Sequence, residues 1–282
     1  MTFNHGVSGS SPERPTILIR DVMQKKITMV QETATIVNQL EMTGGYMRLT
    51  LQAPGVAGLA RPGQFVHARV PGLEESVLRR PFSICDAGDG TLSILYKRVG
   101  VGTAQMATLP NGAEVDLIGP LGNGFPMPRE GAQPVLVAGG YGVAPLYFLA
   151  RKLSTTGHLF AGGKTSADIL CAGEFERLGW TVHAATEDGS LGTRGYVTEA
   201  LLPWLAGQPA AEVFACGPDG LLRALSQNVS QPLWVSLDKH MVCGVGACLA
   251  CVQKIIQPDG SVAQMRVCHD GPVFAGRSVV WN

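Results

Sequence analysis

The chain of 282 residues is long enough for two or three domains with buried cores, since 45% of its residues are hydrophobic and only 16% are charged. Its 22 Lys and Arg residues balance 22 Asp and Glu residues, and this zero net charge argues against a sequence-independent nucleic-acid binder and a polybasic membrane anchor. The longest apolar stretch, residues 134–150, is interrupted by glycines and by Pro145, so no membrane span is expected.

Residues 1–29 mix Ser, Gly, Pro and charged residues, and we interpret them as a flexible leader without chemistry. They lack the apolar core and the cleavage site of a secretory signal. Seven cysteines, four of which belong to the metal-binding motif described below, fit a reducing compartment. We therefore expect a cytoplasmic protein.

Short strands separated by turns are predicted between residues 30 and 130. Six segments show the alternation or the residue types of strands: residues 35–40, 46–51, 64–70, 81–85, 91–97 and 114–118. Six short strands at even spacing predict a small antiparallel β-barrel. The glycine-rich residues 119–125 that follow are interpreted as a linker, with no site assigned.

Two strings in the predicted barrel have side chains suited to a flavin. In Arg79-Arg80-Pro81-Phe82-Ser83, an arginine can pair with a pyrophosphate, an aromatic ring can cover an isoalloxazine and a serine can reach a flavin heteroatom. In the second string, which begins at Leu95-Tyr96-Lys97, Gly102 and Thr103 can open a helix whose N–H groups hold phosphate oxygens. A solvated strand edge remains the alternative for Lys97 and Arg98.

From Pro134 the pattern changes to alternating strands and helices. Residues 135–138 form a continuous apolar run that leads through glycines into an apolar helix, which is typical of a buried parallel strand. Further strands are expected at residues 157–161, 181–185 and 212–216, and further helices at residues 165–176, 197–206 and 219–228. This alternation predicts a parallel α/β domain over residues 131–232.

A glycine-rich turn with Gly139, Gly140 and Gly142 joins the first of these strands to its helix, and can present backbone N–H groups to a pyrophosphate. A buried tight turn is the alternative. Cys216 ends a later strand at the carboxyl edge of the same predicted sheet, where α/β proteins bind their ligands. We interpret it either as a residue beside a bound nicotinamide or as a small buried hydrophobe.

Four cysteines near the C-terminus form the most specific motif of the chain. Cys243, Cys248 and Cys251 have the C-x4-C-x2-C spacing of a plant-type [2Fe–2S] ferredoxin, whose fourth thiolate comes later in the chain. Cys268 is the best-placed fourth ligand, because a polar turn at residues 257–260 allows a hairpin to fold it back. The glycines and alanines between the first three cysteines permit close approach of the backbone to bridging sulfides.

Zinc is the alternative for this motif. Four-cysteine zinc sites usually show two C-x2-C pairs, whereas this motif has one. If the four cysteines were unrelated buried side chains, three of them would not be expected within nine positions of a glycine-rich loop. We therefore predict a small [2Fe–2S] domain over residues 233–282.

In this order, the pieces resemble the ferredoxin–NADP reductase superfamily, in which a flavin-binding barrel precedes a nicotinamide-binding α/β domain. The segments LDKHMVCGVGAC and VCHDGPVF look like those of the electron-transfer subunits of NAD-linked dihydroorotate dehydrogenases, and the similarity covers residues 33–274. The resemblance implies that Cys216 lies beside the nicotinamide where it meets the flavin. It implies FAD contacts at Arg80, Pro81, Phe82, Ser83, Leu95, Tyr96, Lys97, Gly102 and Thr103.

The resemblance implies an electron relay with FAD, a [2Fe–2S] cluster and NAD(H) as cofactors. Nicotinamide exchanges a hydride, which is two electrons, whereas the cluster passes one, and a flavin can couple the two steps. The implied partner is the FMN-containing catalytic subunit of dihydroorotate dehydrogenase, in a heterotetramer that serves pyrimidine biosynthesis. Two alternatives stay open: an NAD(P)H-dependent ferredoxin or sulfhydrogenase-type flavin reductase subunit, and a non-catalytic module in which a metal loop shapes a protein-binding surface.

Overall fold

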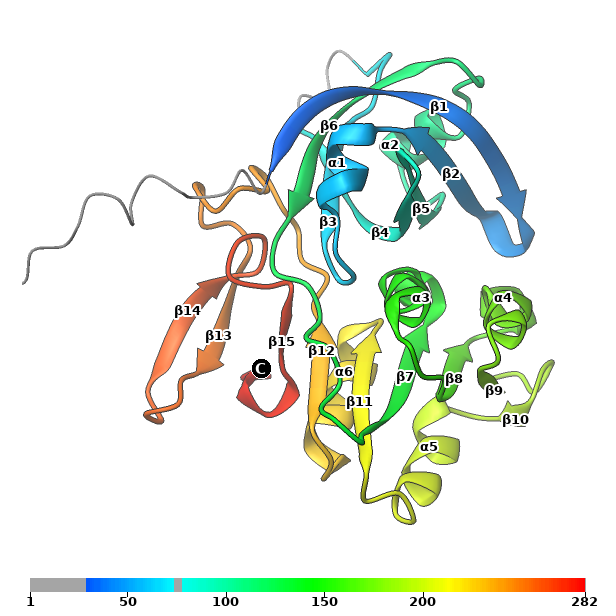
Figure 1. Ribbon diagram of the computed structural model, residues 1–282, viewed down its shortest axis with the longest axis vertical. Coiled ribbons are helices and arrows are strands. Elements are labelled where there is room, and N and C mark those ends of the chain that lie inside the picture. Colours follow the sequence, from blue (N-terminus) through cyan, green and yellow to red (C-terminus); the bar gives the residue numbers. More distant parts are fainter. Residues whose placement is uncertain (1–28, 74–77, 282) are drawn as a thin grey trace, which may run out of the picture.

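The computed structural model describes residues 29–73 and 78–281, so the predicted leader, apart from Met29, lies outside the described residues. Six antiparallel strands close into a barrel in the order β1-β2-β5-β4-β3-β6, which confirms the predicted barrel (Figure 1). Their bounds are Val30–Met42 (β1), Tyr46–Gln52 (β2), Phe65–Arg69 (β3), Arg80–Gly88 (β4), Thr91–Lys97 (β5) and Glu114–Leu121 (β6).

The barrel closes around alternate apolar side chains. Leu49, Ile94 and Leu117 are fully buried inside it, as expected when successive residues of a strand face opposite sides of a sheet. Two short helices, α1 (Pro54–Leu59) and α2 (Val101–Met106), complete the domain. The first was not predicted, because its two glycines are poor helix formers; it nevertheless buries Val56 and Ala57 against the barrel.

A seven-stranded sheet lies below the barrel in the order β10-β9-β8-β7-β11-β12-β15 (Figure 1). All neighbouring pairs are parallel except β12 with β15. The strands are Gln133–Gly139 (β7), His158–Gly163 (β8), Thr181–Thr186 (β9), Thr193–Arg194 (β10), Ala211–Cys216 (β11), Leu233–Ser236 (β12) and Val273–Ala275 (β15). The predicted parallel α/β domain is therefore confirmed.

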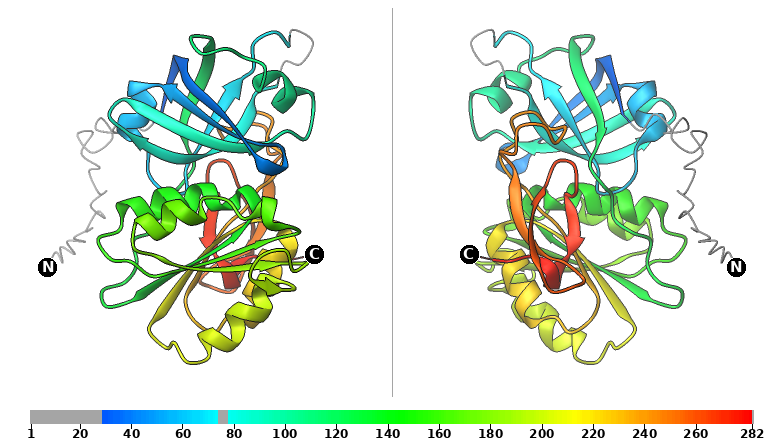
Figure 2. Two further views of the ribbon diagram at one scale, coloured as in Figure 1. Left: turned by 90° about the vertical axis from the view of Figure 1, so that its right-hand side faces the viewer. Right: turned by 90° about the vertical axis from the view of Figure 1, so that its left-hand side faces the viewer.

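Helices cover both faces of this sheet. Helix α3 (Val143–Lys152) lies between the sheet and the barrel, whereas α5 (Val197–Leu205) and α6 (Asp219–Asn228) cover the opposite face (Figure 2). Alternate residues of the central strands face opposite sides of the sheet. Leu136 and Phe214 pack on the α3 side, and Val135 and Val213 pack on the side of α5 and α6. Among the described residues, no helix has the length and apolar content needed to span a bilayer.

One predicted helix is wrong. Residues 165–176 form a 3-10 turn, Ser166–Asp168, and a separate helix α4, Ala172–Arg177, because Cys171 adopts a left-handed conformation with φ of 61°. Asp168 Oδ2 accepts hydrogen bonds from the backbone N–H groups of Lys164 and Thr165, both at 3.1 Å. Such side chain–backbone bonds compete with a continuous helix.

The C-terminal part adds a hairpin and an edge strand. β13 (Val252–Ile256) and β14 (Val262–Arg266) flank the predicted polar turn and form a two-stranded sheet at one side of the molecule (Figure 1). β12 is paired with β11, so the sheet extends to Ser236, past the predicted boundary between residues 232 and 233. With only four residues, β12 gives too short an apolar run to be recognised from the sequence. β15 returns from the cluster segment to pair with β12.

We predict that Phe274→Ala loosens the attachment of the cluster segment to the sheet. Phe274 on β15 is only 7% exposed and shares a core with Val235 and Leu237. Truncation of a buried phenylalanine costs about 3–5 kcal/mol, so the urea midpoint measured by circular dichroism should fall and iron should be lost sooner. The control is Val262→Ala on β14, where the side chain is 57% exposed; equal behaviour of the two variants would contradict this role of Phe274.

Candidate functional site

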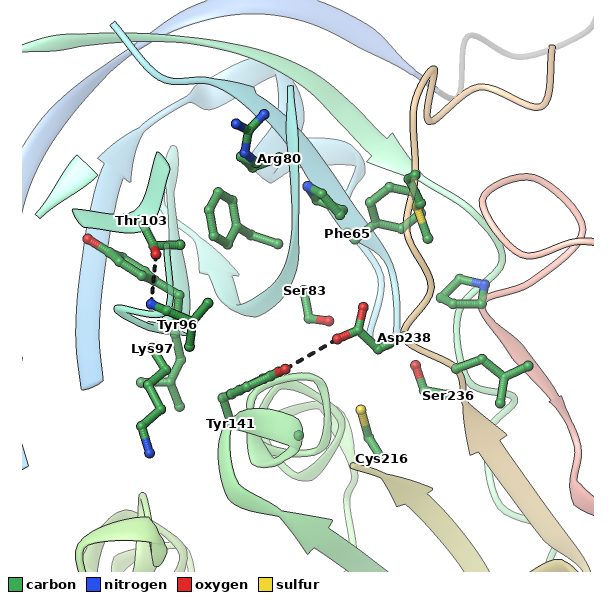
Figure 3. Close-up of a pocket in the computed structure, with 18 residues that line it drawn as sticks. Phe65, Arg80, Ser83, Tyr96, Lys97, Thr103, Tyr141, Cys216, Ser236 and Asp238 are labelled. Atoms are coloured by element: carbon green, nitrogen blue, oxygen red, sulfur yellow. Dashed lines mark hydrogen bonds between the residues drawn. The ribbon is translucent and has the colours of Figure 1, made fainter. Parts of the chain in front are cut away.

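A cavity lies between strands β4 and β5 of the barrel and the carboxyl ends of β11 and β12 (Figure 3). All of the predicted FAD-contacting residues except Gly102 line it: Arg80, Pro81, Phe82, Ser83, Leu95, Tyr96, Lys97 and Thr103. Gly102 lies against Arg80, because a Cβ added to Gly102 would be 2.9 Å from Arg80 Nε. In Figure 3, Arg80 and Cys216 lie at opposite ends of the cavity, with Ser83 between them.

The side chains of this cavity fit a flavin. The rings of Phe82 and Tyr96 lie 5.5 Å apart between centroids and form an aromatic wall. The Tyr96 hydroxyl is buried and has no hydrogen-bond partner among the described residues. Burial, partly offset by the charge of Arg98, raises the pKa of Tyr96 to about 12, so the hydroxyl keeps its proton. A buried donor without a protein partner at the edge of a cavity is explained by a polar ligand such as a flavin.

A second cavity, of about 920 Å³, opens beside the first at the carboxyl ends of β7, β8 and β11. The predicted nicotinamide-site residues Gly139, Gly140, Gly142 and Cys216 all line it. Its volume is of the size that binds small ligands and cofactors. The two cavities share five lining residues, so their contents would meet there: Lys97, Tyr141, Gly142, Cys216 and Asp238.

The glycine turn serves packing as well as the cavity. A Cβ at Gly142 would lie 2.3 Å from the Cys216 carbonyl oxygen, and one at Gly139 would lie 2.6 Å from Pro218 Cδ. Gly140 differs, since its φ is +53° and a Cβ there would approach only the Tyr46 hydroxyl, at 3.2 Å. Gly139 and Gly142 therefore let two strand ends meet, whereas the Gly140 backbone borders the open cavity.

Cys216 ends strand β11 and is 7% exposed. Burial, followed by the charge of Asp238, raises the pKa of the Cys216 thiol to about 12. The thiol is therefore neutral at physiological pH and suits contact with a ring better than nucleophilic attack. Burial also raises the pKa of Tyr141 to about 12, and its hydroxyl donates to Asp238 Oδ2 at 3.3 Å.

Sequence reasoning assigned no role to Tyr141, Ser236 or Asp238, although all three line the cavity with Cys216. Ser236 could have been found, since it ends a parallel strand at the edge where α/β proteins bind ligands. The Tyr141–Asp238 pair joins residues that are 97 positions apart. No local pattern indicates such a pair.

Lys97 is more than a solvated strand residue. Its Nζ lies 3.3 Å from Asp168 Oδ1 and 4.4 Å from the centroid of the Tyr46 ring. Tyr46 donates to the same carboxylate at 2.8 Å. Burial acts to raise the pKa of Asp168, but the hydrogen bonds from Tyr46 and the Thr165 backbone and the contact with Lys97 lower it overall. The charged carboxylate thereby ties the barrel to the α/β domain at the edge of both cavities.

The four predicted cluster ligands approach one another as two pairs. Cys243 Sγ accepts from the backbone N–H groups of Ala247 and Cys248, at 3.3 and 3.4 Å, and it also interacts with the Cys248 thiol. Cys251 Sγ accepts from the Cys268 backbone N–H at 3.4 Å, and these two thiols interact. Over residues 29–73 and 78–281, no three potential metal-ligating side chains converge in metal-site geometry.

The chemistry of these thiols nevertheless fits a cluster. Burial acts to raise the pKa of Cys243, but N–H groups of Val245 and Cys248 and neighbouring donors outweigh it and lower the pKa to about 6. Burial and the Cys251 thiol raise the pKa of Cys268 to about 12. Backbone donors directed at one sulfur, in a loop with three thiols and small residues and with a fourth thiol beside it, are what thiolate ligation of iron–sulfur clusters needs.

The turn that presents Cys268 is anchored to the barrel domain. Asn123 Nδ2 donates to the carbonyl oxygens of His269 and Asp270, at 3.2 and 3.0 Å. Arg266 pairs with Asp270 at 2.9 Å and donates to the carbonyl of Gly246 in the cysteine loop at 3.2 Å. Residues 119–125, interpreted above as a linker, therefore help to place the fourth cysteine.

A cavity with an aromatic wall on a six-stranded barrel, a second cavity at the carboxyl edge of a parallel sheet, and the residues that the two cavities share define a reductase of the ferredoxin–NADP reductase type. A solved structure titled "Insights into flavin-based electron bifurcation via the NADH-dependent reduced ferredoxin-NADP oxidoreductase structure" matches with a TM-score of 0.77 and 29% identity over 88% of this chain and 90% of that one. A ferredoxin NADP+ reductase from Neisseria gonorrhoeae shares the fold, with a TM-score of 0.59 and 16% identity over 71% of this chain and 90% of that one.

The comparisons with known sequences identify the family. Residues 238–280 match the iron-sulfur cluster binding domain of dihydroorotate dehydrogenase B, and residues 136–227 match an oxidoreductase NAD-binding domain. The chain is 40% identical over 258 residues to the dihydroorotate dehydrogenase B (NAD(+)) electron transfer subunit of Bacillus caldolyticus, covering 89% of this chain and 98% of the relative. The corresponding subunit of Desulforamulus reducens is 38% identical over 242 residues, covering 83% of this chain and 92% of the relative.

The chain belongs to the family of dihydroorotate dehydrogenase B (NAD(+)) electron transfer subunits. This confirms the resemblance drawn from the cysteine motif and the order of the domains. The matched domains and the structural neighbours support FAD, an iron–sulfur cluster and NAD as the cofactors. The individual contact residues remain predictions.

We predict that Cys268→Ser lowers the iron content of the purified protein and bleaches its visible cluster absorption, while FAD stays bound. Cys268 interacts with the Cys251 thiol and supplies the fourth thiolate of the motif. Iron is measured by a chelator assay and flavin by its absorbance after denaturation. The matched control is Cys171→Ser, a buried cysteine outside the motif, which should retain iron. Full iron content in Cys268→Ser would show that Cys268 is not a cluster ligand.

Arg80→Ala is expected to release FAD on dilution, with the iron left in place. Arg80 lies at the end of the first cavity remote from Cys216, where it can pair with the phosphates of FAD. A hydrogen bond to a charged group is worth about 1.5–3 kcal/mol, which corresponds to a roughly 10- to 100-fold weaker flavin affinity. Gel filtration followed by flavin quantification measures the loss. Stoichiometric FAD in the eluted variant would contradict this role.

Proposed function

We propose that this chain passes electrons between the FMN of a dihydroorotate dehydrogenase catalytic subunit and NAD, by way of a [2Fe–2S] cluster and FAD. The two subunits form a heterotetramer of the pyrimidine biosynthesis pathway. The observation that carries the proposal is the junction of the two cavities at Tyr141, Gly142, Cys216 and Asp238, together with the four-cysteine motif in the same chain. When bound, FAD would connect two-electron exchange with NAD to one-electron exchange with the cluster.

The residues of the chain bind and orient the two cofactors. Arg80 would pair with the phosphates of FAD, and Tyr96 could donate its buried hydroxyl to the polar part of the ring system. On the other side, the backbone at Gly140 borders the place for a pyrophosphate, and the neutral Cys216 thiol lies where the two cavities join. With both cofactors bound, these residues would orient the two rings toward each other, and such positioning is what direct hydride transfer requires of the protein.

The partner is proposed to dock over the cysteine loop. Three apolar side chains of this loop are exposed: Val242 at 43%, Val245 at 38% and Leu249 at 60%. Cys248, which lies between them in the sequence, is exposed as well. Exposed apolar side chains clustered on one loop are typical of protein–protein contacts. A subunit bound here would bring its own redox centre near the cluster.

NAD is the proposed nicotinamide cofactor, and the cytoplasm is the proposed compartment. The curated relatives carry NAD(+) in their names. Glu187 lines the second cavity, and a carboxylate can accept a hydrogen bond from a ribose hydroxyl but repels a phosphate. None of the seven cysteines, all of which are described, forms a disulfide. Free thiols and thiolate ligands fit a reducing compartment.

Coexpression with an FMN-containing dihydroorotate dehydrogenase subunit tests the proposed function. We expect the two chains to copurify and the complex to reduce NAD+ with dihydroorotate, which the catalytic subunit alone should not do. Reduction of ferredoxin by NADH, without any NAD-dependent oxidation of dihydroorotate, would favour the alternative reductase. A colourless protein without flavin or iron would favour the non-catalytic module.

We predict that Cys216→Ala slows the reduction of bound FAD by NADH by about tenfold or more, because small displacements of reacting rings are costly. The rate is measured by stopped-flow absorbance of the flavin. Chemical reduction of the cluster by dithionite should not change. Cys216→Ser, which keeps a small polar group at the same place, is the matched control and should retain more of the rate. An unchanged rate in Cys216→Ala would contradict this role and show that Cys216 only packs in the core.

A further inference from the structure

A histidine is buried directly beneath the cysteine loop. His67 on β3 is 1% exposed, and neither of its ring nitrogens has a hydrogen-bond partner among the described residues. Gly244, the residue after the first cysteine of the motif, has a φ of +71°. A Cβ at this glycine would lie only 2.5 Å from His67 Nδ1. The loop backbone and the imidazole therefore lie so close together that no side chain fits between them.

The imidazole has two ring nitrogens and needs a hydrogen-bond acceptor for each one that carries a proton. At least one ring nitrogen of a histidine carries a proton, and burying such a donor unpaired costs about 1–3 kcal/mol. The cationic neighbours of the ring are Arg79 and Arg80, whose guanidinium groups can only donate. Arg79 already donates to the carbonyl oxygens of His67 and Asp116, at 3.4 and 2.8 Å. The backbone groups of Arg79 and of Cys243 both act to raise the pKa of His67, so their carbonyl oxygens are acceptors close to the ring. One belongs to the barrel and the other to the first cysteine of the motif.

His67 also belongs to the flavin-binding part of the barrel. In the register of β3 with β4, His67 is paired with Pro81, and Phe65 is paired with Ser83. Phe65, Pro81 and Ser83 all line the first cavity. One residue thus contacts the cysteine loop while its strand forms the wall of the flavin cavity. Any hydrogen bond from this ring to the loop would link the two redox sites mechanically.

We propose that His67 is a positioning residue that donates a hydrogen bond to the Cys243–Gly244 segment of the loaded cluster loop and so holds the cluster against the flavin-binding strands. This inference rests on the proposed function only in taking Cys243 as a cluster ligand. Hydrogen bonds near cluster sulfurs stabilise the negative charge gained on reduction, and they raise the reduction potential. His67 should therefore set the cluster potential as well as the loop position.

The test is a redox titration of the purified holoprotein, monitored by EPR for the cluster and by absorbance for the flavin. In His67→Phe, which keeps a ring but removes the donor, the cluster midpoint should shift to more negative values while the FAD midpoint stays unchanged. His67→Asn, whose amide can occupy the place of Nδ1, should restore much of the shift. His183→Phe replaces a ring that is stacked on Phe160 in the α/β sheet, and should leave both midpoints unchanged.

A wild-type midpoint and EPR spectrum in His67→Phe, with full iron content, would overturn the proposal. Equal shifts in His67→Phe and His67→Asn would overturn it too, because they would show a packing effect. If His67→Phe loses its cluster during purification, iron retention decides: retention in His67→Asn supports the hydrogen bond, and equal loss refutes it. None of these readouts needs dihydroorotate or a partner subunit, so a failure of the proposed function would be seen separately.

Discussion

The close approach of two strand ends is the constraint on which the candidate site depends. The turn after β7 can lie against the end of β11 only because residue 142 has no side chain, since a Cβ there would lie 2.3 Å from the Cys216 carbonyl oxygen. This contact places Cys216 and Tyr141 on the wall that the two cavities share. Cofactors bound in the two cavities would meet at these shared residues.

The barrel is held over this junction by polar contacts at its rim. Tyr46 and Lys97 of the barrel converge on Asp168 of the α/β domain, and Arg48 pairs with Glu174 at 2.9 Å. The cysteine segment is fastened independently, through Asn123 on the barrel side and through β15 on the sheet side. The relative positions of three sites thus depend on separate sets of contacts. Breaking the contacts between the barrel and the α/β domain need not detach the cysteine segment, and the reverse also holds.

Much of this arrangement could be predicted because its signals are local. Strand alternation in the barrel, the apolar run before Gly139 and the spacing of Cys243, Cys248 and Cys251 each lie within a few residues of sequence. The predicted flavin residues gather in one cavity for the same reason, since β4 and β5 are adjacent strands.

What could not be predicted depends on contacts between distant segments. The Tyr141–Asp238 pair and the packing of His67 on Gly244 exist only after the domains have assembled. The helix expected at residues 165–176 failed because Asp168 bonds to the backbone before it. The edge strand β15 has three residues, too few to stand out from its surroundings.

The central claim is that one chain links hydride exchange with NAD to single-electron exchange at a cysteine-bound cluster. Rapid mixing of the anaerobic holoprotein with NADH, followed by freeze-quench EPR and flavin absorbance, measures this most directly. We expect the flavin to bleach first and the EPR signal of the reduced cluster to appear afterwards. A bleached flavin beside a cluster that stays oxidised, although dithionite reduces it, would show that the chain does not connect the two centres.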